Sequence, residues 1–267
     1  MSIYGIIAAQ VLGVAFAPPP PAVVPAKPAI ESNAEPPADE RAAFERRLEA
    51  VDEAMSKVTD LRAKFEQRKH TPLLKKPLVS KGTVVTKGER VRWDTAEPRE
   101  STLLVGDGKV RLFYPADKLV EEYPAGEGFK DLAGGPLPRL AVLKQRFEIT
   151  PMTPKELGVA DAPSRLLALR LTPRTEELRN HVASVQVLID EATPAAIKVV
   201  IVDPEGETTE ILFSDVKPNV GVSDADVALK LPDGVRISRP LGEETGKSSR
   251  PNPGSEPQGE SGREGPR

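Results

Sequence analysis

The chain has 267 residues, with 37 Lys and Arg against 40 Asp and Glu, a formal net charge of -3, two His, 28 Pro and no Cys. The absence of Cys excludes a disulfide framework, a cysteine-based zinc or iron–sulfur site and a thiol nucleophile. The near balance of charge gives no sign of the strongly basic face that nucleic-acid binding requires. His70 and His181 have no spacing typical of a metal site. The composition therefore favours a binding protein, with no metal and no cofactor, over an enzyme.

Residues 1–17 predict either a signal peptide or an N-terminal apolar anchor. Ile3 to Phe16 is an uncharged apolar run, and it is shorter than the roughly 20 residues that a membrane-spanning helix needs. Ala15-Phe16-Ala17 has the small-x-small pattern of a cleavage site. Pro18 would follow the cut, where proline hinders the peptidase. We expect export, and the sequence leaves open whether the leader is removed.

Two further segments have the composition of linkers. Residues 18–38 are rich in proline, which favours an extended polyproline II spacer. Residues 244–267 are rich in Gly, Pro and Ser and lack large apolar side chains, so burial cannot offset the entropy of ordering them. We therefore expect one folded domain at residues 39–243, between a spacer and a disordered tail.

The folded domain opens with a predicted helix. Asp39 can cap it, and apolar residues recur at spacings of three and four from Phe44 to Val58, on one helical face. Charges of both signs occupy the other face, which favours packing on a core over lying on a membrane. A second, short helix is predicted at Pro136 to Lys144, with its prolines in the first turn.

From Leu61 onward the apolar residues alternate, which is typical of strands with one apolar face. Turn residues separate the runs, and Asp107-Gly108 predicts a tight hairpin. About a dozen strands against two helices predict an α+β, mostly β fold: a large curved antiparallel sheet with helices on one side. The expected strands are Leu61–Arg68, Gly82–Thr86, Arg90–Asp94, Ser101–Val105, Val110–Tyr114, Lys118–Tyr123, Phe147–Ile149, Arg165–Leu171, Val182–Asp190, Ile197–Asp203, Thr208–Phe213, Val227–Leu231 and Val235–Ile237.

A sheet of this size rarely stays flat, and if it curls without closing, its concave face must be covered or filled. Large apolar side chains in alternating positions then either line a cavity or form an ordinary core. Composition does not decide between these two readings.

Several short motifs, taken in order over about residues 40 to 240, resemble the LolA family of periplasmic lipoprotein carriers. Each motif is short, and their order and spacing carry the resemblance. They are Phe65-Glu66-Gln67, Gly82-Thr83-Val84-Val85, Val91-Arg92-Trp93 with Pro98, Leu104 to Lys109, Leu112 to Pro115, Leu171-Thr172-Pro173, Asp203 to Gly206, Asn219 and Leu231 to Val235.

The resemblance implies an unclosed β-barrel covered by helices, with an apolar cavity for the acyl chains of lipoproteins. It also implies a periplasmic monomer with three kinds of partner: acylated lipoproteins, an inner-membrane ABC transporter and an outer-membrane acceptor. The strand of Trp93 is expected to face the cavity. The expected acyl-chain-binding residues are Val91, Trp93, Leu104, Leu112, Tyr114, Val187 and Ile189.

The chain also departs from the family pattern. Lys87-Gly88-Glu89-Arg90 replaces a basic residue and proline before the tryptophan strand, so Arg90 is expected to substitute for an arginine that latches the lid. Leu137 and Leu140 are assigned to the same lid. His70 to Val79 is an extra excursion between the first strands, which can alter the cavity mouth or a partner surface.

Two other readings stay open beside the carrier. One is a lipid or lipoprotein sensor on the same scaffold, tethered to the inner membrane if the leader is retained, and the other is a purely structural module. Catalysis is not expected, because the candidate carboxylate pairs lie at predicted hairpin ends, where acids are ordinary turn formers. These pairs are Asp190 with Glu191, and Asp203 with Glu205 and Glu207.

Overall fold

The computed structural model describes residues 38–125, 135–137 and 139–240. The leader, the spacer up to residue 37 and the tail lie outside these residues, so the predictions made for them stay predictions. No helix within the described ranges combines the length and the apolar character needed to cross a bilayer.

The described strands form one sheet in the order β12-β6-β5-β4-β3-β2-β1-β11-β10-β9-β8-β7. All neighbours pair antiparallel except β12 and β6, which are parallel. Because β12 and β7 are the two edges, the sheet does not close. The strands are β1 Asp60–His70, β2 Leu78–Lys87, β3 Arg90–Glu97, β4 Ser101–Gly106, β5 Lys109–Tyr114, β6 Leu119–Pro124, β7 Phe147–Met152, β8 Leu166–Pro173, β9 Ser184–Asp190, β10 Ala195–Val202, β11 Thr208–Pro218 and β12 Arg236–Ser238.

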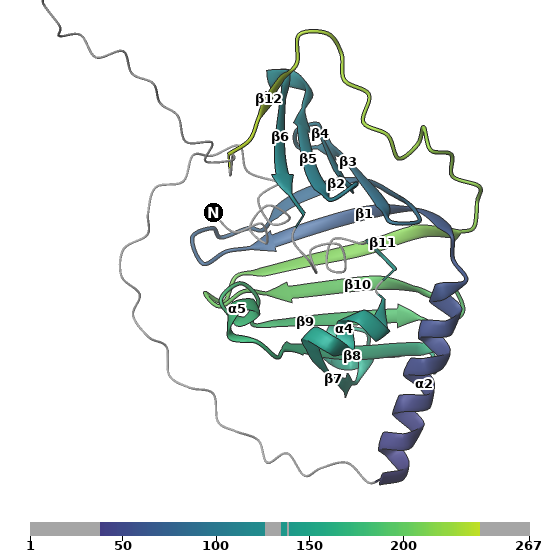
Figure 1. Ribbon diagram of the computed structural model, residues 1–267. Helices are drawn as coiled ribbons and strands as arrows, with labels where there is room; N and C mark the ends of the chain where they lie inside the picture. The colour runs from purple at the N-terminus through teal and green to yellow at the C-terminus, as the bar shows by residue number, and fades with distance from the viewer. Residues whose placement is uncertain (1–37, 126–134, 138, 241–267) are drawn as a thin grey trace, which may run out of the picture.

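The helices of the described ranges are α2 Ala38–Ser56, α4 Leu140–Arg146 and α5 Glu176–Arg179, with short 3-10 turns at Pro115–Asp117 and Pro154–Leu157. Figure 1 shows a strongly twisted sheet, with β2 to β6 in its upper part and α2 and α4 in front of β7 to β10. The predicted mostly β class and the unclosed sheet with few helices are confirmed.

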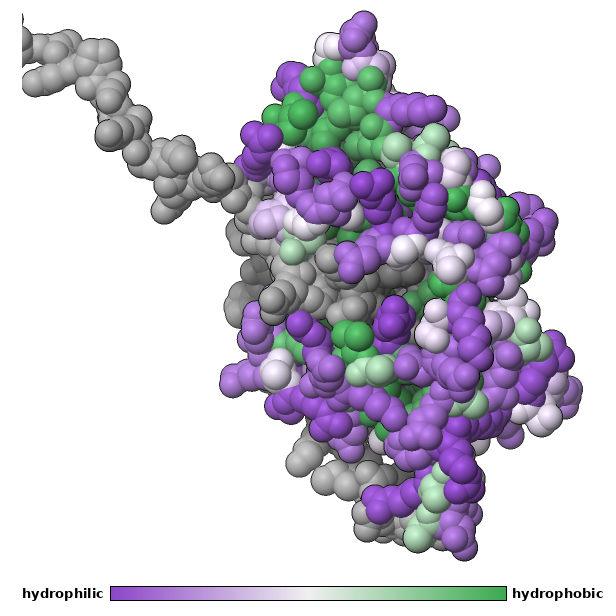
Figure 2. All heavy atoms as spheres, turned by 45° about the vertical axis from the view of Figure 1, so that its right-hand side comes forward, coloured by the Kyte–Doolittle hydropathy of each residue, from purple (hydrophilic) through white to green (hydrophobic). Residues whose placement is uncertain are grey.

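One face of the sheet, here called the inner face, carries Trp93 and packs against α2 and α4. Two apolar clusters cover it, and Val199 of β10 contacts both. The first joins β1 to β6 with β11, and the second joins β7 to β10 with the helices. Figure 2 shows mostly polar side chains over the visible side, including α2, and an apolar area near the top, so α2 turns its apolar side inward.

The opposite, outer face is partly covered by the segment that follows β11. Val222 and Val227 pack on Val85 of β2, and Arg92 Nη1 donates a hydrogen bond to the carbonyl oxygen of Ala228, 2.7 Å away. The prediction of a strand at Val227–Leu231 is therefore wrong: this segment crosses the outer face and pairs with none of the described strands.

Several element boundaries differ from the prediction. Asp39 lies inside the first turn of α2 rather than before it. The second helix begins at Leu140, four residues later than expected, because the Pro136 carbonyl accepts a hydrogen bond from Ala196 N–H of β10 at 2.7 Å. The extra excursion after His70 is the projecting end of the β1–β2 hairpin, which exposes Leu73.

Candidate functional site

The inner face of β1 to β5 centres on Trp93, which is buried. The strand registers place Val84 of β2 and Leu103 of β4 directly opposite it. The indole meets the ring of Phe65 at 4.9 Å between centroids and the ring of Phe213 at 5.8 Å. Three aromatic rings from β1, β3 and β11 thus form the middle of an apolar floor.

All the predicted acyl-chain-binding residues except Leu104 lie on the inner face. Those on β3 and β5 belong to the apolar cluster around Trp93, and those on β9 belong to the cluster beneath the helices. The structure therefore brings the predicted residues to one face but divides them between two clusters. The first group is Val91, Trp93, Leu112 and Tyr114, and the second is Val187 and Ile189.

Leu104 lies on the outer face, so its assignment to the same floor as Trp93 is wrong. Its partner across the ladder is Arg92, whereas its chain neighbours Leu103 and Val105 oppose Trp93 and Val91. The β4–β5 turn sets this register. Because Gly106 pairs with Lys109, Val105 lies opposite Val110, and Leu103 lies on the same face as Val105 while Leu104 lies on the other.

The described floor also includes side chains that the sequence analysis did not assign to binding. Three of them come from β1 and β11, which pair although they are distant in the chain, and the others come from β2, β4 and β5. These residues are Phe65, Val84, Leu103, Val105, Val110, Ile211 and Phe213.

A short strap, Gly135–Leu137, crosses the inner face just before α4. A Cβ on Gly135 would lie 3.2 Å from Val84 Cγ2 and 3.7 Å from Trp93 Cζ2, so the backbone of the strap touches the floor. Its φ of 71° is in the left-handed region that favours glycine. The bond from Ala196 N–H to the Pro136 carbonyl fixes the strap to β10. A β-bulge between Ala196 and Lys198 interrupts the β9–β10 register at this point.

The three residues assigned to the lid occupy different places. Leu137 packs against the cluster around Trp93, while Leu140 is buried in the cluster beneath the helices. Arg90 lies at the end of β3, where its guanidinium is 3.1 Å from the carboxylate of Asp107 in the β4–β5 turn. These two side chains are 42% and 57% exposed, so the pair joins two hairpin ends at the surface.

Among the described residues, three buried polar atoms have no hydrogen-bond partner: Gln67 Nε2, Thr86 Oγ1 and Ser101 Oγ. All three residues alternate with members of the Trp93 cluster and share its face. An unpaired polar group away from water destabilises the folded state. These three atoms are therefore available to form hydrogen bonds with a ligand on this face.

Glu121 of β6 opposes Leu112 and brings a carboxylate to the same face. The hydroxyl of Tyr123 donates to Glu121 Oε2 at 3.0 Å. Burial, together with this carboxylate, raises the pKa of Tyr123, and the same two causes raise the pKa of Tyr114 to about 12. Both phenols therefore stay neutral and can act as hydrogen-bond donors.

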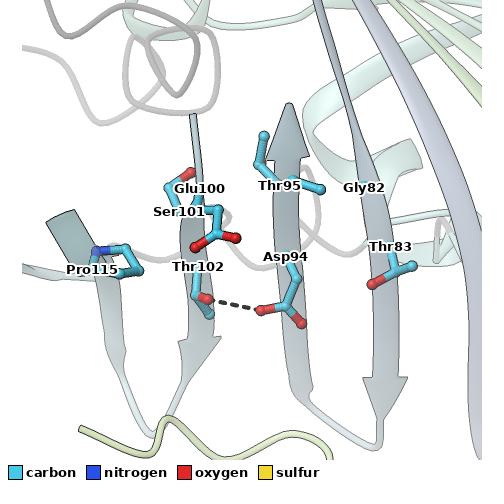
Figure 3. A pocket seen from close by; sticks show the side chains of 9 residues that line it. Gly82, Thr83, Asp94, Thr95, Glu100, Ser101, Thr102 and Pro115 are labelled. Carbon is cyan, nitrogen blue, oxygen red and sulfur yellow. Dashed lines mark hydrogen bonds between the residues drawn. The ribbon is translucent and has the colours of Figure 1, made fainter. Parts of the chain in front are cut away.

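A hollow of about 300 Å³ opens at the ends of β2, β3 and β4, and Ser101 is among the residues that line it. Figure 3 shows Asp94 accepting a hydrogen bond from Thr102 Oγ1, at 2.7 Å, beside this hollow. Arg92 also holds the Asp94 carboxylate, with Nη2 to Oδ1 at 2.9 Å. Asp94, one of the two acidic residues that line the hollow, is thus already paired within the sheet.

Two of the carboxylates considered for catalysis bind backbone amides in their turns, while Glu191 pairs with Arg47 and Glu207 pairs with Lys69. Asp190 Oδ1 accepts a hydrogen bond from Ala192 N–H at 3.0 Å, and Asp203 Oδ1 accepts one from Glu207 N–H at 2.8 Å. Burial raises the pKa of Asp203. No group of three or more His, Cys, Asp or Glu suited to a metal occurs within the described ranges.

The fold and this face define a class: an open β-sheet with an apolar inner face crossed by a strap. No family model matches the chain, and no curated protein matches it in sequence. Among solved structures, the chain is similar to an uncharacterized conserved protein from Thermus thermophilus, at 12% identity and a TM-score of 0.47, over 74% of this chain and 99% of that one.

The chain is also similar to the MucA/MucB complex structure from Pseudomonas aeruginosa, at 12% identity and a TM-score of 0.39, over 70% of this chain and 61% of that one. It is similar to a LolA superfamily protein from Nitrosomonas europaea, at 13% identity and a TM-score of 0.38, over 70% and 97%. A LolA superfamily protein is thus among the structures to which the chain is similar.

Proposed function

We propose that the protein binds the acyl chains of lipids or lipoproteins against the inner face around Trp93, without making or breaking a covalent bond. The observation that carries this proposal is the continuous apolar floor from β1 to β5 and β11, crossed by a strap rather than by a second sheet. Each methylene moved from water onto such a floor contributes about 0.8 kcal/mol.

The strap is the part of the structure that could move to release an acyl ligand from the floor. The strap touches the floor through the Gly135 backbone and the side chain of Leu137, and a hydrogen bond from Ala196 N–H ties it to β10. A cover whose open and closed states differ by a few kcal/mol would suit a ligand that must be both held and delivered.

The specific form of this function is a periplasmic carrier that moves acylated lipoproteins from the inner to the outer membrane. Its partners are then an inner-membrane ABC transporter that loads it and an outer-membrane acceptor that unloads it. The predicted export leader and the family motifs support this form. The second candidate is a lipid or lipoprotein sensor, which the proline-rich spacer after a retained leader would suit.

Trp93 is the one tryptophan of the chain, so its fluorescence reports directly on the floor. Phosphatidylcholine vesicles with bromine on the acyl chains should quench Trp93 emission, while vesicles without bromine should not. As a matched control, Trp93→Phe combined with Phe113→Trp moves the reporter to β5. Phe113 opposes Thr102, next to Leu103 on the other face, so this reporter should stay unquenched. Equal quenching of both reporters, or of neither, would contradict binding at the inner face.

A second experiment separates the carrier from the sensor. The full chain is incubated with inner-membrane vesicles and ATP, and acylated lipoproteins are measured in the soluble fraction. A carrier releases them in an ATP-dependent manner, and Trp93→Glu abolishes the release. A sensor that binds acyl chains gives quenching in the first experiment and no soluble lipoprotein in this one.

A further inference from the structure

The loop between β1 and β2 displays two leucines to solvent. Leu73 is 89% exposed and Leu74 is 47% exposed. Together with Val79 of β2, they make up half of the exposed large apolar residues of the described ranges. Figure 1 shows this loop projecting from the sheet at the left. Burial within the chain therefore gives these leucines no stabilising role.

The loop stands beyond the neighbouring turn and is held in a defined shape. β3 ends at Glu97, opposite Lys81 of β2, whereas the β1–β2 ladder continues to Leu78. Within the loop, Leu74 N–H donates a hydrogen bond to the carbonyl oxygen of Thr71 at 3.1 Å. The prolines at positions 72 and 77 restrict the backbone on either side of this turn. The leucines are therefore presented at a fixed position.

The same hairpin carries an excess of positive charge. From Gln67 to Gly88 the sequence has six Lys and Arg and no Asp or Glu, in a chain with a net charge of -3. Lys75 and Lys76 directly follow the two leucines, are exposed, and form no ion pair with any described residue. The tip thus presents two unpaired ammonium groups beside two exposed leucines.

The adjacent β10–β11 turn carries acids, but two of them already have partners. Glu207 pairs with Lys69 at the base of the hairpin, at 2.8 Å. Asp203 accepts a hydrogen bond from the Glu207 N–H, also at 2.8 Å. Glu205 therefore stands against the two lysines of the tip, and the two loops together remain positively charged.

A bilayer surface suits this loop better than a protein partner does. Stable protein interfaces involve about 20–30 residues a side and are depleted in Lys, whereas the exposed part of this loop is Pro72 to Lys76. Leu side chains can enter the boundary between lipid headgroups and acyl chains, and Lys side chains can reach lipid phosphates from there. The adjacent leucines and lysines match these two layers.

We propose that the β1–β2 loop docks the protein on an anionic phospholipid bilayer, with Leu73 and Leu74 at the acyl boundary and the two lysines on lipid phosphates. The contact is small, so docking is weak and reversible. Because β1 also carries Phe65 of the floor, docking brings one end of that strand to the membrane. The inference goes beyond the proposed function, because it requires no acyl ligand on the floor.

A fluorescent label at the tip tests the proposal in the full chain. The chain has no Cys, so Leu73→Cys gives a single site for a nitrobenzoxadiazole label, whose emission rises when it leaves water. We expect a rise with vesicles of phosphatidylcholine and phosphatidylglycerol, and a much smaller one with phosphatidylcholine alone. Leu231→Cys is the matched control, because Leu231 is also exposed and follows the exposed Lys230. Its label should stay in water.

The lysines are tested in the labelled Leu73→Cys chain. Lys75→Gln combined with Lys76→Gln should weaken binding to vesicles with phosphatidylglycerol about thirtyfold, because each lysine near an anionic surface contributes about fivefold. Added salt should weaken the binding of the chain that keeps both lysines. Lys230→Gln should leave the binding unchanged, and urea unfolding checks that each variant is folded.

Three results would each overturn docking through this loop. They are an unchanged emission at position 73, an equal rise at positions 73 and 231, and a rise that depends neither on phosphatidylglycerol nor on the two lysines. A chain held on vesicles by its predicted leader alone gives the first result, which would leave a protein partner as the occupant of the loop. The quenching of Trp93 by bound acyl chains is a separate measurement, so the proposed function is decided independently.

Discussion

The rings of Phe65 and Trp93 meet edge to face, with 4.9 Å between centroids and 68° between planes, although β2 lies between their strands. Gly82 of β2 makes this possible. It pairs with Phe65 across the ladder, and a Cβ at this position would lie 2.8 Å from the Phe65 ring and 1.9 Å from the carbonyl oxygen of Asp94. The contact between the two rings therefore requires a glycine at position 82.

Gly82→Ala should destabilise the protein by about 2–3 kcal/mol, because the new methyl group has to displace backbone as well as a packed ring. Urea unfolding followed by circular dichroism measures the loss. Gly106→Ala is the control: its Cβ would meet only Arg90, with Cγ at 2.9 Å, and that exposed side chain can move aside. A loss as large in Gly106→Ala would show that the crowding at Asp94 is not the cause.

Gly135→Ala should loosen the strap and raise the affinity for acyl ligands. The substitution strains a backbone with φ of 71°, at about 1 kcal/mol, and places a methyl group 3.2 Å from Val84. The quenching titration of Trp93 measures the affinity. Gly206→Ala has similar backbone strain, at φ of 83°, with no described atom within 4 Å of its Cβ. It should lose stability without a change in affinity, and a matching change in affinity would refute a covering role for the strap.

Glu122 should make stability depend on pH in the acidic range. Lys109, Arg111 and Arg239 surround its carboxylate, and their hydrogen bonds lower its pKa from 4.5 to about 2. Because the folded-state pKa is the lower one, the stabilisation is complete above pH 4.5 and is lost as the pH falls toward about 2. Glu122→Gln should therefore be less stable than the wild type at neutral pH, and the difference should shrink on acidification.

Urea unfolding at several pH values measures this difference. Glu148→Gln, a substitution at an exposed position of the edge strand β7, serves as the control. Its free energy of unfolding should change with pH as that of the wild type does. A gap between Glu122→Gln and the wild type that stays constant down to the lowest pH would show that the carboxylate charge is not responsible.

Asn219, just after the end of β11, should contribute to the stability of the folded state through its contact with the start of β1. Its side-chain oxygen accepts a hydrogen bond from Thr59 N–H at 2.9 Å, and its backbone has a left-handed φ of 54°. Asn219→Ala removes the acceptor and strains the backbone, so we expect a loss of about 1–2 kcal/mol. Asn219→Asp keeps the acceptor, and Asn219→Gly relieves the strain alone. Each should recover part of the stability in urea unfolding, and recovery by neither would refute this account.

The hairpins and the mostly β class could be predicted because their signals are local. Asp107-Gly108 predicts its turn, and both residues have the positive φ that such a turn needs. The strand at Val227–Leu231 was predicted on the same kind of signal and was wrong, because β-propensity does not supply a ladder partner. Leu104 was assigned to acyl binding although Leu103 is the residue opposite Trp93, because the face of a side chain depends on the strand register and not on the residue type.

Local patterns predicted most of the elements, because alternation indicates where a strand runs and turn residues indicate where it reverses. The face that becomes the floor was not predictable from them, because it depends on β1 pairing with β11, a contact between distant parts of the chain. The same pairing sets Phe213 opposite Phe65 and buries Gln67 without a partner for its amide nitrogen among the described residues. Burial and hydrogen-bond satisfaction are properties of the assembled sheet, and no local pattern contains them.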